Sequence, residues 1–560
     1  EHNSNTSVLA QAKRLVRILE SCARRRCRAL ERKTMRVSTP IRAAIALSAI
    51  LVLASCSSSN TPAPDTSSSS TDAVADRTAT VTYAGLVSPS HLDPHRGVTE
   101  NDIGMLRYMY DSLTTVNPDG SPAPALAESW ELSEDGNTFT MVMREGATFV
   151  DGEPVNAAAV VANLNRMTTD PNSTVAYVLA PIIASSEVVD ERTVQLNLQA
   201  PGGALPTIFA SRTGMMVSPK ALENPESLAI TPAGAGAFEL VANVPGSSYS
   251  FVRRDDYWDK DAYKFAKLEY LIQVDTATRL NALQAGETTL TSLVGSQLQE
   301  AQAAGLKTWE MEGPGTAFAR MSLNSARSEF GNKLVRQAMN AATDRQGIAT
   351  TLYADQCVPS AQPYPEGYFA HSDTVDDSGW ANYDPALAKK LLAEAGLPNG
   401  FSFTAVVPTL SIYNNTALVL QQNLADVGIT MNLEVLDATQ ARQAFVTGSA
   451  DALVGVYGGS TDPGLYAMSA YSPKSGDNPG GLTTPNMAAL IVDTQRSTDL
   501  KERGLAYDKL MEEVFEMGPA QIAICAPLGV QASQTNVYDF IQTPSLGGSA
   551  AMRTMWVAKK

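Results

Sequence analysis

Residues 124–167 read PALAESWELSEDGNTFTMVMREGATFVDGEPVNAAAVVANLNRM. This stretch predicts a β-hairpin followed by a capped helix. Residues 138–143 alternate apolar and polar side chains as a half-buried strand does, and residues 130–132 supply a partner strand. The Glu-Asp-Gly-Asn sequence between them is typical of a tight turn. A second turn over residues 151–154 leads to Asn156, a good N-cap for a helix that runs to the end of the stretch.

The order of residues in this stretch is more specific than its secondary structure. It resembles the signature of the family 5 extracytoplasmic solute-binding proteins, which include the oligopeptide- and dipeptide-binding proteins of ABC importers. The residues that carry this resemblance are Leu126, Ala127, Ser129, Trp130, Asp135, Gly136, Arg144, Glu145, Gly146, Phe149, Asp151, Gly152, Glu153 and Pro154. Weaker matches extend the resemblance over roughly residues 79–545.

The charge of the chain is unevenly distributed. Residues 1–55 contain 11 of the 42 Lys and Arg residues and 3 of the 58 Asp and Glu residues, so the remainder has a net charge of −24. A chain this acidic would repel phosphates, which makes nucleic acid a poor candidate for a partner. The length of 560 residues predicts several domains or lobes.

Residues 36–56 have the pattern of an export signal. Two arginines precede an apolar run of 12 residues, 43–54. That run is too short for a membrane span of about 20 residues, but it suits a signal peptide. The Leu-Ala-Ser-Cys sequence at its end resembles a bacterial lipobox, which implies that Cys56 is lipidated. The alternative is an ordinary signal peptide with an incidental cysteine.

The segments around this signal have separate interpretations. Residues 1–34 contain three consecutive arginines and two cysteines, and they are expected to be a leader added by a mis-assigned start. The alternative is a basic cytoplasmic extension. Residues 35–55 are then the lipoprotein signal peptide. Residues 56–78 are rich in Ser, Thr and Pro, cannot form a core, and are expected to be a flexible tether.

The cysteines and histidines outside this leader give little indication of a catalytic or metal-binding role. Cys357 and Cys525 would lie in an oxidising compartment, where a disulfide and two separate buried thiols are both open. His91 and His95 are four positions apart, but Pro94 argues against a helix that would bring them together, and no third ligand is close in the sequence. No metal site and no cofactor are expected.

The family resemblance implies a fold. The fold is α/β and periplasmic-binding-protein-like (type II), with two lobes, a hinge between them and an extra subdomain. Lobe I is expected over residues 79–113, 233–310 and 525–560, its subdomain over 114–232, and lobe II over 311–524. Strands alternate with helices in lobe II, including one helix over residues 333–353, as is typical of α/β lobes. The segment 520–530 is expected to cross the hinge.

The resemblance also implies ligand-binding residues. In the family, the backbone before the first helix faces the ligand, which indicates Val98, Thr99 and Glu100. Aromatic walls would come from Tyr108 and Tyr457. A strand end and a Gly-rich loop supply the remaining candidates, which are Gly455, Val456, Gly458, Ser460 and Asp462.

This loop departs from the peptide-binding pattern W-x-x-D-x-x-D-P, whose first Asp neutralises the ammonium group of a peptide. The chain has Tyr457 in place of Trp, is one residue shorter, and carries Ser460 where that Asp is expected. A buried ammonium without a carboxylate is costly. Either Asp462 or Glu100 compensates, or the ligand lacks a free α-amine. The simplest alternative is that Asp462 and Pro463 only form a turn.

The function implied by the resemblance is the capture of a small ligand, in the first place a peptide. Lobe closure would deliver the ligand to the transmembrane subunits of an ABC permease. The alternatives are a non-peptide solute, such as a metal chelate or a sugar, and an orphan receptor that is not coupled to transport. An enzyme is not expected, since the chain has no H-E-x-x-H or G-x-S-x-G motif. We expect a monomer in the cell envelope, either lipid-anchored on the outer face of the cytoplasmic membrane or in the periplasm.

Overall fold

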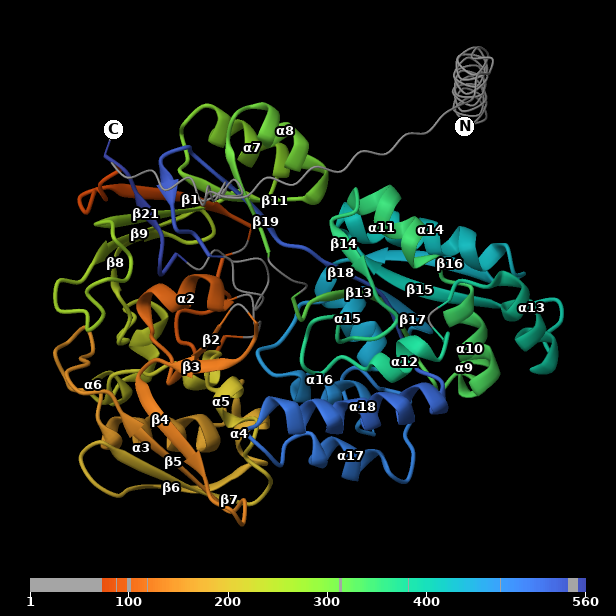
Figure 1. Ribbon diagram of the computed structural model, residues 1–560, viewed down its shortest axis with the longest axis horizontal. Coiled ribbons are helices and arrows are strands. Elements are labelled where there is room, and N and C mark those ends of the chain that lie inside the picture. The colour runs from red at the N-terminus through yellow and green to blue at the C-terminus, as the bar shows by residue number, and fades with distance from the viewer. Residues whose placement is uncertain are drawn as a thin grey trace, which may run out of the picture. The chain divides into compact units, whose positions relative to one another are not determined.

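The computed structural model describes residues 73–86, 88–97, 102–117, 119–311, 315–380, 382–473, 475–541 and 552–559 (Figure 1). They belong to one compact unit, Thr71–Lys560. Cys56, the expected leader and the expected signal peptide lie outside the described residues. None of the helices that the structure describes is both long and apolar enough to cross a membrane.

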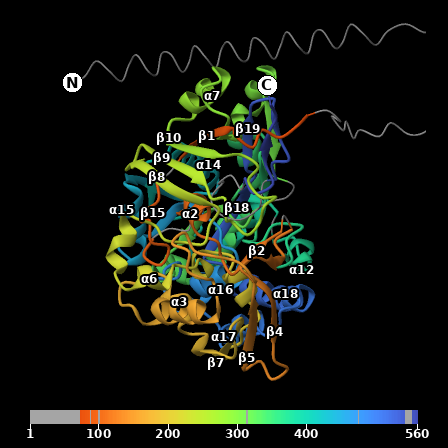
Figure 2. The same cartoon turned by 90° about the vertical axis from the view of Figure 1, so that its left-hand side faces the viewer.

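The largest sheet has seven strands in the order β12-β19-β11-β1-β10-β9-β8. They are β1 (Thr80–Gly85), β8 (Phe238–Val244), β9 (Ser248–Arg253), β10 (Lys267–Ile272), β11 (Leu290–Leu293), β12 (Lys307–Glu310) and β19 (Val530–Ser533). The central strand β1 pairs in parallel with β10 and β11, and the outer pairs are antiparallel. Figure 2 shows β8, β9, β10 and β1 side by side. The sheet therefore combines strands from both ends of the sequence.

Short elements accompany this sheet. They are α2 (Ile103–Met109), α7 (Thr276–Gln284), η4 (Gly295–Gln297), α8 (Leu298–Ala303), and the pair β20 (Val537–Tyr538) and β21 (Trp556–Val557). Residues 74–76 hydrogen-bond to the last described segment, since Asp76 N donates to Val557 O and Lys559 N donates to Val74 O. Residues 74–76 of the expected tether (56–78) are therefore joined to the folded part of the chain.

The stretch 124–167 supplies two strands and most of one helix of a second, smaller part of the fold, whose four-stranded antiparallel sheet has the order β4-β5-β7-β6. Its strands are β4 (Ala127–Leu132), β5 (Thr138–Met143), β6 (Ile183–Val188) and β7 (Thr193–Leu198), and α3 (Ala157–Thr169) packs on β6 and β7. Asn156 caps α3 as predicted, because its Oδ1 accepts a hydrogen bond from Ala159 N at 2.9 Å. Smaller elements complete the unit: β2 (Thr114–Val116), β3 (Pro122–Pro124), α4 (Ala176–Leu179), α5 (Leu205–Ile208), η2 (Arg212–Gly214), α6 (Pro219–Leu222) and η3 (Pro225–Ala229).

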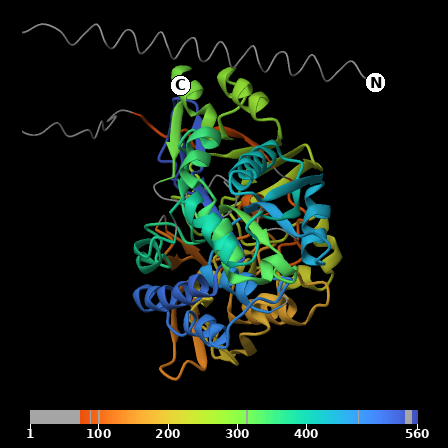
Figure 3. The ribbon, with the colours of Figure 1, turned by 90° about the vertical axis from the view of Figure 1, so that its right-hand side faces the viewer.

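A third sheet has six strands in the order β14-β18-β13-β17-β15-β16. They are β13 (Phe318–Leu323), β14 (Cys357–Pro359), β15 (Ser402–Pro408), β16 (Thr430–Leu436), β17 (Ala452–Tyr457) and β18 (Gln521–Pro527). Its helices are α9 (Ser328–Gly331), α10 (Lys333–Ala341), α11 (Arg345–Tyr353), α12 (Asp373–Asp377), α13 (Pro385–Glu394), α14 (Ser411–Ala425), α15 (Ala438–Val446), α16 (Pro463–Tyr471), α17 (Met487–Asp493) and α18 (Leu500–Met517). Figure 3 shows the last three as blue helices low in the view.

One helix prediction in this region is wrong. Residues 333–353 form two helices, α10 and α11, and not one. The break falls at Thr343 and Asp344, where the Asp344 side chain accepts a hydrogen bond from Gly347 N at 2.9 Å and so begins a new helix.

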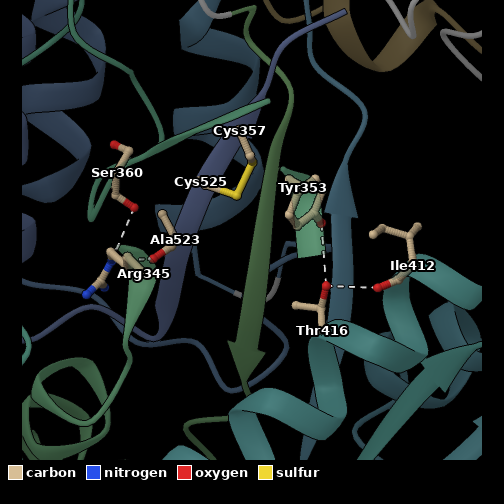
Figure 4. The surroundings of a disulfide bond; sticks show 8 residues. All are labelled: Arg345, Tyr353, Cys357, Ser360, Ile412, Thr416, Ala523 and Cys525. Atoms are coloured by element: carbon tan, nitrogen blue, oxygen red, sulfur yellow. Dashed lines mark hydrogen bonds between the residues drawn. A yellow bond between two sulfur atoms is a disulfide. The ribbon is translucent and has the colours of Figure 1, made fainter. Parts of the chain in front are cut away.

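The chain crosses between the six-stranded and seven-stranded sheets at two places. The first crossing joins β12 to β13, and the second joins β18 to β19 through Leu528 and Gly529. Next to the second crossing, a disulfide between Cys357 and Cys525 ties β18 to the edge strand β14, with Cα atoms 5.5 Å apart (Figure 4). The sequence left this pairing open, and the structure forms the bond.

Candidate functional site

A cavity of about 340 Å³ lies where the end of β17 faces α4 and η2. On the side of the six-stranded sheet it is lined by Arg442, Tyr457, Gly458, Gly459, Ser460, Leu465, Ser469 and Asp477, and on the side of the four-stranded sheet by Val175, Tyr177, Val178, Ser211, Arg212 and Thr213. Segments that belong to two different sheets thus close around one space. Its volume is at the small end of the roughly 300–1,000 Å³ that is usual for ligand pockets.

The Gly-rich loop after β17 forms part of one wall. Gly459 has a φ of +88°, a region that L side chains rarely adopt, and a Cβ atom there would lie 2.7 Å from Thr316 Oγ1. The Thr316 hydroxyl accepts a hydrogen bond from Ser460 N at 3.0 Å and donates one to Ser460 O at 2.8 Å. A side chain from the first crossing segment therefore fixes the loop that the ligand would meet.

The Asp477 carboxylate in the same wall binds two arginines. Its Oδ1 accepts hydrogen bonds from Arg320 Nη2 and Arg442 Nη1, both at 2.6 Å, and its Oδ2 accepts one from Ser469 Oγ at 2.6 Å. Burial alone would raise the pKa of Asp477, but the two guanidinium groups outweigh that effect and lower the pKa to about 2. Asp477 therefore stays ionised near neutral pH.

Arg212 lies in the opposite wall and is almost fully buried. Its Nη1 donates hydrogen bonds to Gly97 O, to Pro94 O at 3.3 Å and to Thr174 Oγ1 at 3.2 Å. These bonds attach the turn that follows β1 to η2. Val98, Thr99 and Glu100, the ligand-binding residues that are expected next in the sequence, lie outside the described residues.

Of the remaining predicted site residues, some line the cavity and others lie earlier in β17. Tyr457, Gly458 and Ser460 lie in the cavity wall. Val456 and Gly455, one and two residues before Tyr457 in β17, pair with β13. Burial raises the pKa of the Tyr457 phenol, so the group stays neutral at physiological pH. These positions agree with a strand that delivers its end to the cavity.

Tyr108, which is expected to form an aromatic wall of the ligand site, does not line this cavity. Its side chain is fully buried, and its ring packs against Phe238, Phe251 and Tyr263 at centroid distances of 6.0–6.1 Å. Tyr108 is therefore a core residue of the unit built on the seven-stranded sheet. A short helix gave no sequence signal for which of its faces would be covered.

Asp462 does not face the cavity either. It is fully buried, and both carboxylate oxygens accept hydrogen bonds from Arg503 Nη2, at 3.0 and 2.8 Å. Oδ1 also caps α16 through Gly464 N at 2.7 Å, and Oδ2 accepts the Thr207 hydroxyl. The carboxylate is thus fully used inside the protein, so Asp462 cannot serve a ligand ammonium without breaking this cluster.

Sequence reasoning missed several lining residues. Arg442, Asp477 and Arg212 carry the charges of the cavity, but no local motif marks them, because tertiary packing brings their separate elements together. One signal was available for Ser469. Asp462 followed by Pro463 has the form of an N-cap with proline at the first helical position, which predicts α16 and places Ser469 on it.

His91 and His95, which precede α2, both have partners within the protein. His95 is fully buried, where its ring nitrogens contact Met215 O at 2.9 Å and Arg166 Nη1 at 3.0 Å. Burial lowers the pKa of His95 to about 4. His91 Nδ1 accepts a hydrogen bond from Asp93 N at 2.9 Å. Across the described ranges, no group of three or more His, Cys, Asp or Glu residues could hold a metal ion.

The chain is similar to known bacterial solute-binding proteins. Residues 121–479 match the family described as bacterial extracellular solute-binding proteins, family 5 middle region. The glutathione-binding protein GsiB of Salmonella typhi is 29% identical over 476 residues, which cover 82% of this chain and 91% of that protein. GsiB of Escherichia coli K12 is 28% identical over 475 residues, with the same coverage.

Solved structures share the fold. The periplasmic binding protein AgaA of A. tumefaciens R10, in complex with agropinic acid, has a TM-score of 0.74 at 26% identity, over 86% of this chain and 99% of that chain. The Helicobacter pylori protein DppA, in complex with the peptide STSA, has a TM-score of 0.74 at 21% identity, over 86% and 98%. These similarities confirm the expected two-lobed α/β fold of periplasmic binding proteins.

Proposed function

Because this chain belongs to the bacterial extracellular solute-binding proteins of family 5, we propose that it captures a small peptide and delivers it to an ABC permease by closure of its two lobes. Proteins of this family bind solutes for ABC importers and are not enzymes. The observation that carries the peptide proposal is the cavity at the end of β17, which joins a strand end and a Gly-rich loop to polar and charged side chains from the facing unit.

The size and charge of the cavity support a short peptide. About 340 Å³ is space for a ligand of a few residues and not for a long chain. Arg212 and Arg442 lie in opposite walls, and guanidinium groups suit the carboxylates that every unmodified peptide carries. The relatives named glutathione-binding proteins make glutathione, a tripeptide with two carboxylates, the first ligand to test.

A non-peptide solute is the second candidate. Asp462 is committed to Arg503 and Thr207. Ser460 stands where the peptide-binding pattern implied by the resemblance has the Asp that would pair with an ammonium group. A ligand without a free α-amine would avoid a buried, unpaired ammonium. AgaA, which is 26% identical to this chain, was solved with agropinic acid. An orphan receptor without a permease would bind the same ligands, so only the partner distinguishes it.

The domain organisation is part of the proposal. Lobe I comprises residues 79–113, 233–310 and 525–560, its subdomain comprises 114–232, and lobe II comprises 311–524. The three sheets support this division, because each draws its strands almost wholly from one of these parts. β18 (Gln521–Pro527) overlaps the last boundary, since it pairs with lobe II strands, so the second hinge crossing falls at residues 528–529.

We also propose that the protein acts outside the cytoplasm as a monomer, and that Cys56 anchors it to the membrane through a lipid. The lipobox-like sequence before Cys56 and the Ser-rich segment after it support this. Radiolabelled palmitate incorporation into the wild type, and its loss in Cys56→Ser, would test the anchor.

Native mass spectrometry tests the ligand proposal directly. The full-length chain is expressed in a bacterial host, purified gently from the envelope and sprayed without denaturant. A bound mass or mass series that fragments into amino acids supports a peptide importer. A single mass that yields no amino acids, or titration calorimetry in which glutathione and tripeptides bind no better than maltose, would overturn the peptide proposal.

A further inference from the structure

Two arginines share one carboxylate in the wall of the cavity. Asp477 Oδ1 accepts a hydrogen bond from Arg320 Nη2 and another from Arg442 Nη1, each at 2.6 Å. The three side chains together carry a charge of +1. This surplus positive charge attracts an anion to whichever of the two guanidinium groups a ligand can reach.

Arg320 cannot present the surplus charge to a ligand. Its side chain is only 6% exposed, and its Nη1 donates to Gln521 Oε1 at 3.1 Å. The guanidinium carbon also lies 5.4–5.9 Å from the ring centroids of Phe318, Tyr457 and Tyr466. These contacts enclose Arg320 on the protein side of Asp477.

Arg442, in contrast to Arg320, lies where a ligand can reach it. Its side chain is 42% exposed, and it lines the cavity from α15. In the part of the chain that the structure describes, Asp477 is its one ion-pair partner, through Nη1. A guanidinium carries five N–H donors, so donors remain after this bond. Asp477 also fixes the orientation of the group, which lowers the entropy that a ligand contact would cost.

The charged residues that line the cavity include two arginines and one aspartate. Among its described lining residues, Arg212 and Arg442 are the cations and Asp477 is the carboxylate. Asp477 already accepts three hydrogen bonds, which leaves it poorly suited to bind a ligand cation. Arg212 Nη1 already donates to Pro94 O, Gly97 O and Thr174 Oγ1. The complementarity of the cavity to a negatively charged ligand therefore rests on Arg442.

We propose that Arg442 is a specificity-determining residue that binds a carboxylate group of the ligand, so that the cavity selects carboxylate-bearing solutes over their amides and over neutral solutes. This inference rests on the proposed role as a solute-binding protein. It is independent of whether the ligand is a peptide, because peptide acids and other organic acids carry the same group.

Titration calorimetry on the full chain tests the assignment with matched probes. The probes are Ala-Ala-Ala, its C-terminal amide, glutathione, agropinic acid and maltose. Arg442→Gln removes the positive charge. Arg442→Lys keeps the charge but lacks the planar guanidinium group with its paired N–H donors. Arg77→Gln is the matched control. Arg77 forms an exposed ion pair with Asp261. Thermal unfolding of each variant establishes that it is folded.

We expect the wild type and Arg77→Gln to prefer an acid over its amide or a neutral probe by about 10- to 100-fold, the usual effect of a hydrogen bond between charged groups. Arg442→Gln should lose this preference, and Arg442→Lys should keep part of it. Binding of agropinic acid but no peptide, still dependent on Arg442, would overturn the peptide proposal and support this one. Equal affinity for acid and amide, an unchanged preference in Arg442→Gln, or binding of maltose alone would overturn the role of Arg442.

Discussion

The Thr207 hydroxyl donates a hydrogen bond to the Asp462 carboxylate across 255 positions of sequence. Thr207 belongs to α5 of the proposed subdomain, and Asp462 precedes α16 of the proposed lobe II. Both residues are buried, and Arg503 neutralises the Asp462 charge at 2.8 Å. The proposed subdomain and lobe II also meet through Gly203 N, which donates to Gln495 O at 2.8 Å. The Asp462 carboxylate, which forms a buried ion pair within the proposed lobe II, therefore accepts a hydrogen bond from the proposed subdomain.

We predict that Thr207→Val weakens ligand binding. If the lobes open without ligand, this hydrogen bond forms only in the closed state, and its loss shifts the equilibrium toward the open state. A hydrogen bond to a charged group contributes about 1.5–3 kcal/mol, so the apparent affinity for the native ligand should fall at least 10-fold. Calorimetry measures the affinity, and small-angle scattering measures closure.

Thr207→Ser is the matched control for this prediction, because it keeps the hydroxyl and removes only a methyl group. It should bind and close like the wild type. If Thr207→Val binds ligand as tightly as Thr207→Ser does, the contact with Asp462 makes no contribution to closure.

A second prediction concerns the disulfide. Cys357 and Cys525 close a loop of 168 residues, and chain entropy for so long a loop predicts a stabilisation of up to about 5 kcal/mol, with measured values usually 2–5 kcal/mol. The double variant Cys357→Ala, Cys525→Ala should lose this amount in urea unfolding. Reductant should destabilise the wild type similarly and leave the double variant unchanged. A reductant effect of equal size in both proteins would show that another bond is responsible.

The hairpin and the helix cap of residues 124–167 could be predicted because a few neighbouring residues decide them. Asn156 needs only its own side chain and the next turn to cap a helix. The prediction of one continuous helix over residues 333–353 is wrong because a single residue interrupts a longer pattern. Its apolar periodicity continues through the break, and only the Asp344 cap, which competes with helix continuation, separates α10 from α11.

The cavity shows the same division between local and tertiary signals. The loop from Tyr457 to Ser460 could be found, because a strand that ends in glycines is a local pattern. The charge cluster could not, since Asp477 meets Arg442 from 35 positions away and Arg320 from 157. The sequence alone indicates a turn or a ligand contact for Asp462, because its partners Arg503 and Thr207 come from distant elements. Such pairings depend on how whole elements pack.

A third prediction follows from His95, whose pKa burial lowers from 6.5 to about 4. Between these values the unfolded chain binds a proton that the native state does not, so the free energy of unfolding falls as the pH falls through this window. From pH 7 to pH 5 the loss from this group should be about 2 kcal/mol. Urea unfolding at both pH values should show a smaller loss for His95→Gln than for the wild type.

His371 provides a control of opposite sign. Although burial opposes its charge, hydrogen bonds to Asp376 and Tyr364 prevail and raise its pKa above 6.5. Its stabilisation is present below the unfolded pKa and is lost as the pH rises through the folded one. His371→Gln should therefore steepen the loss of stability from pH 7 to pH 5. If His95→Gln steepens it as well, the lowered pKa of His95 is wrong.

The last prediction concerns Thr316, whose hydroxyl bridges Ser460 N and Ser460 O at 3.0 and 2.8 Å. Thr316→Val removes the hydroxyl that pairs with the buried Ser460 N–H and Ser460 C=O groups. Leaving these groups unpaired should lower the free energy of unfolding by about 1–3 kcal/mol. The loop should also become less ordered in the cavity wall, so ligand affinity should fall roughly 10-fold, as expected when a contact surface must be ordered on binding. Thr316→Ser retains the hydroxyl and should restore both quantities. Because Thr316 lies on the first crossing segment, loss of stability without any loss of affinity would mean that the crossing supports the fold but does not position the ligand loop.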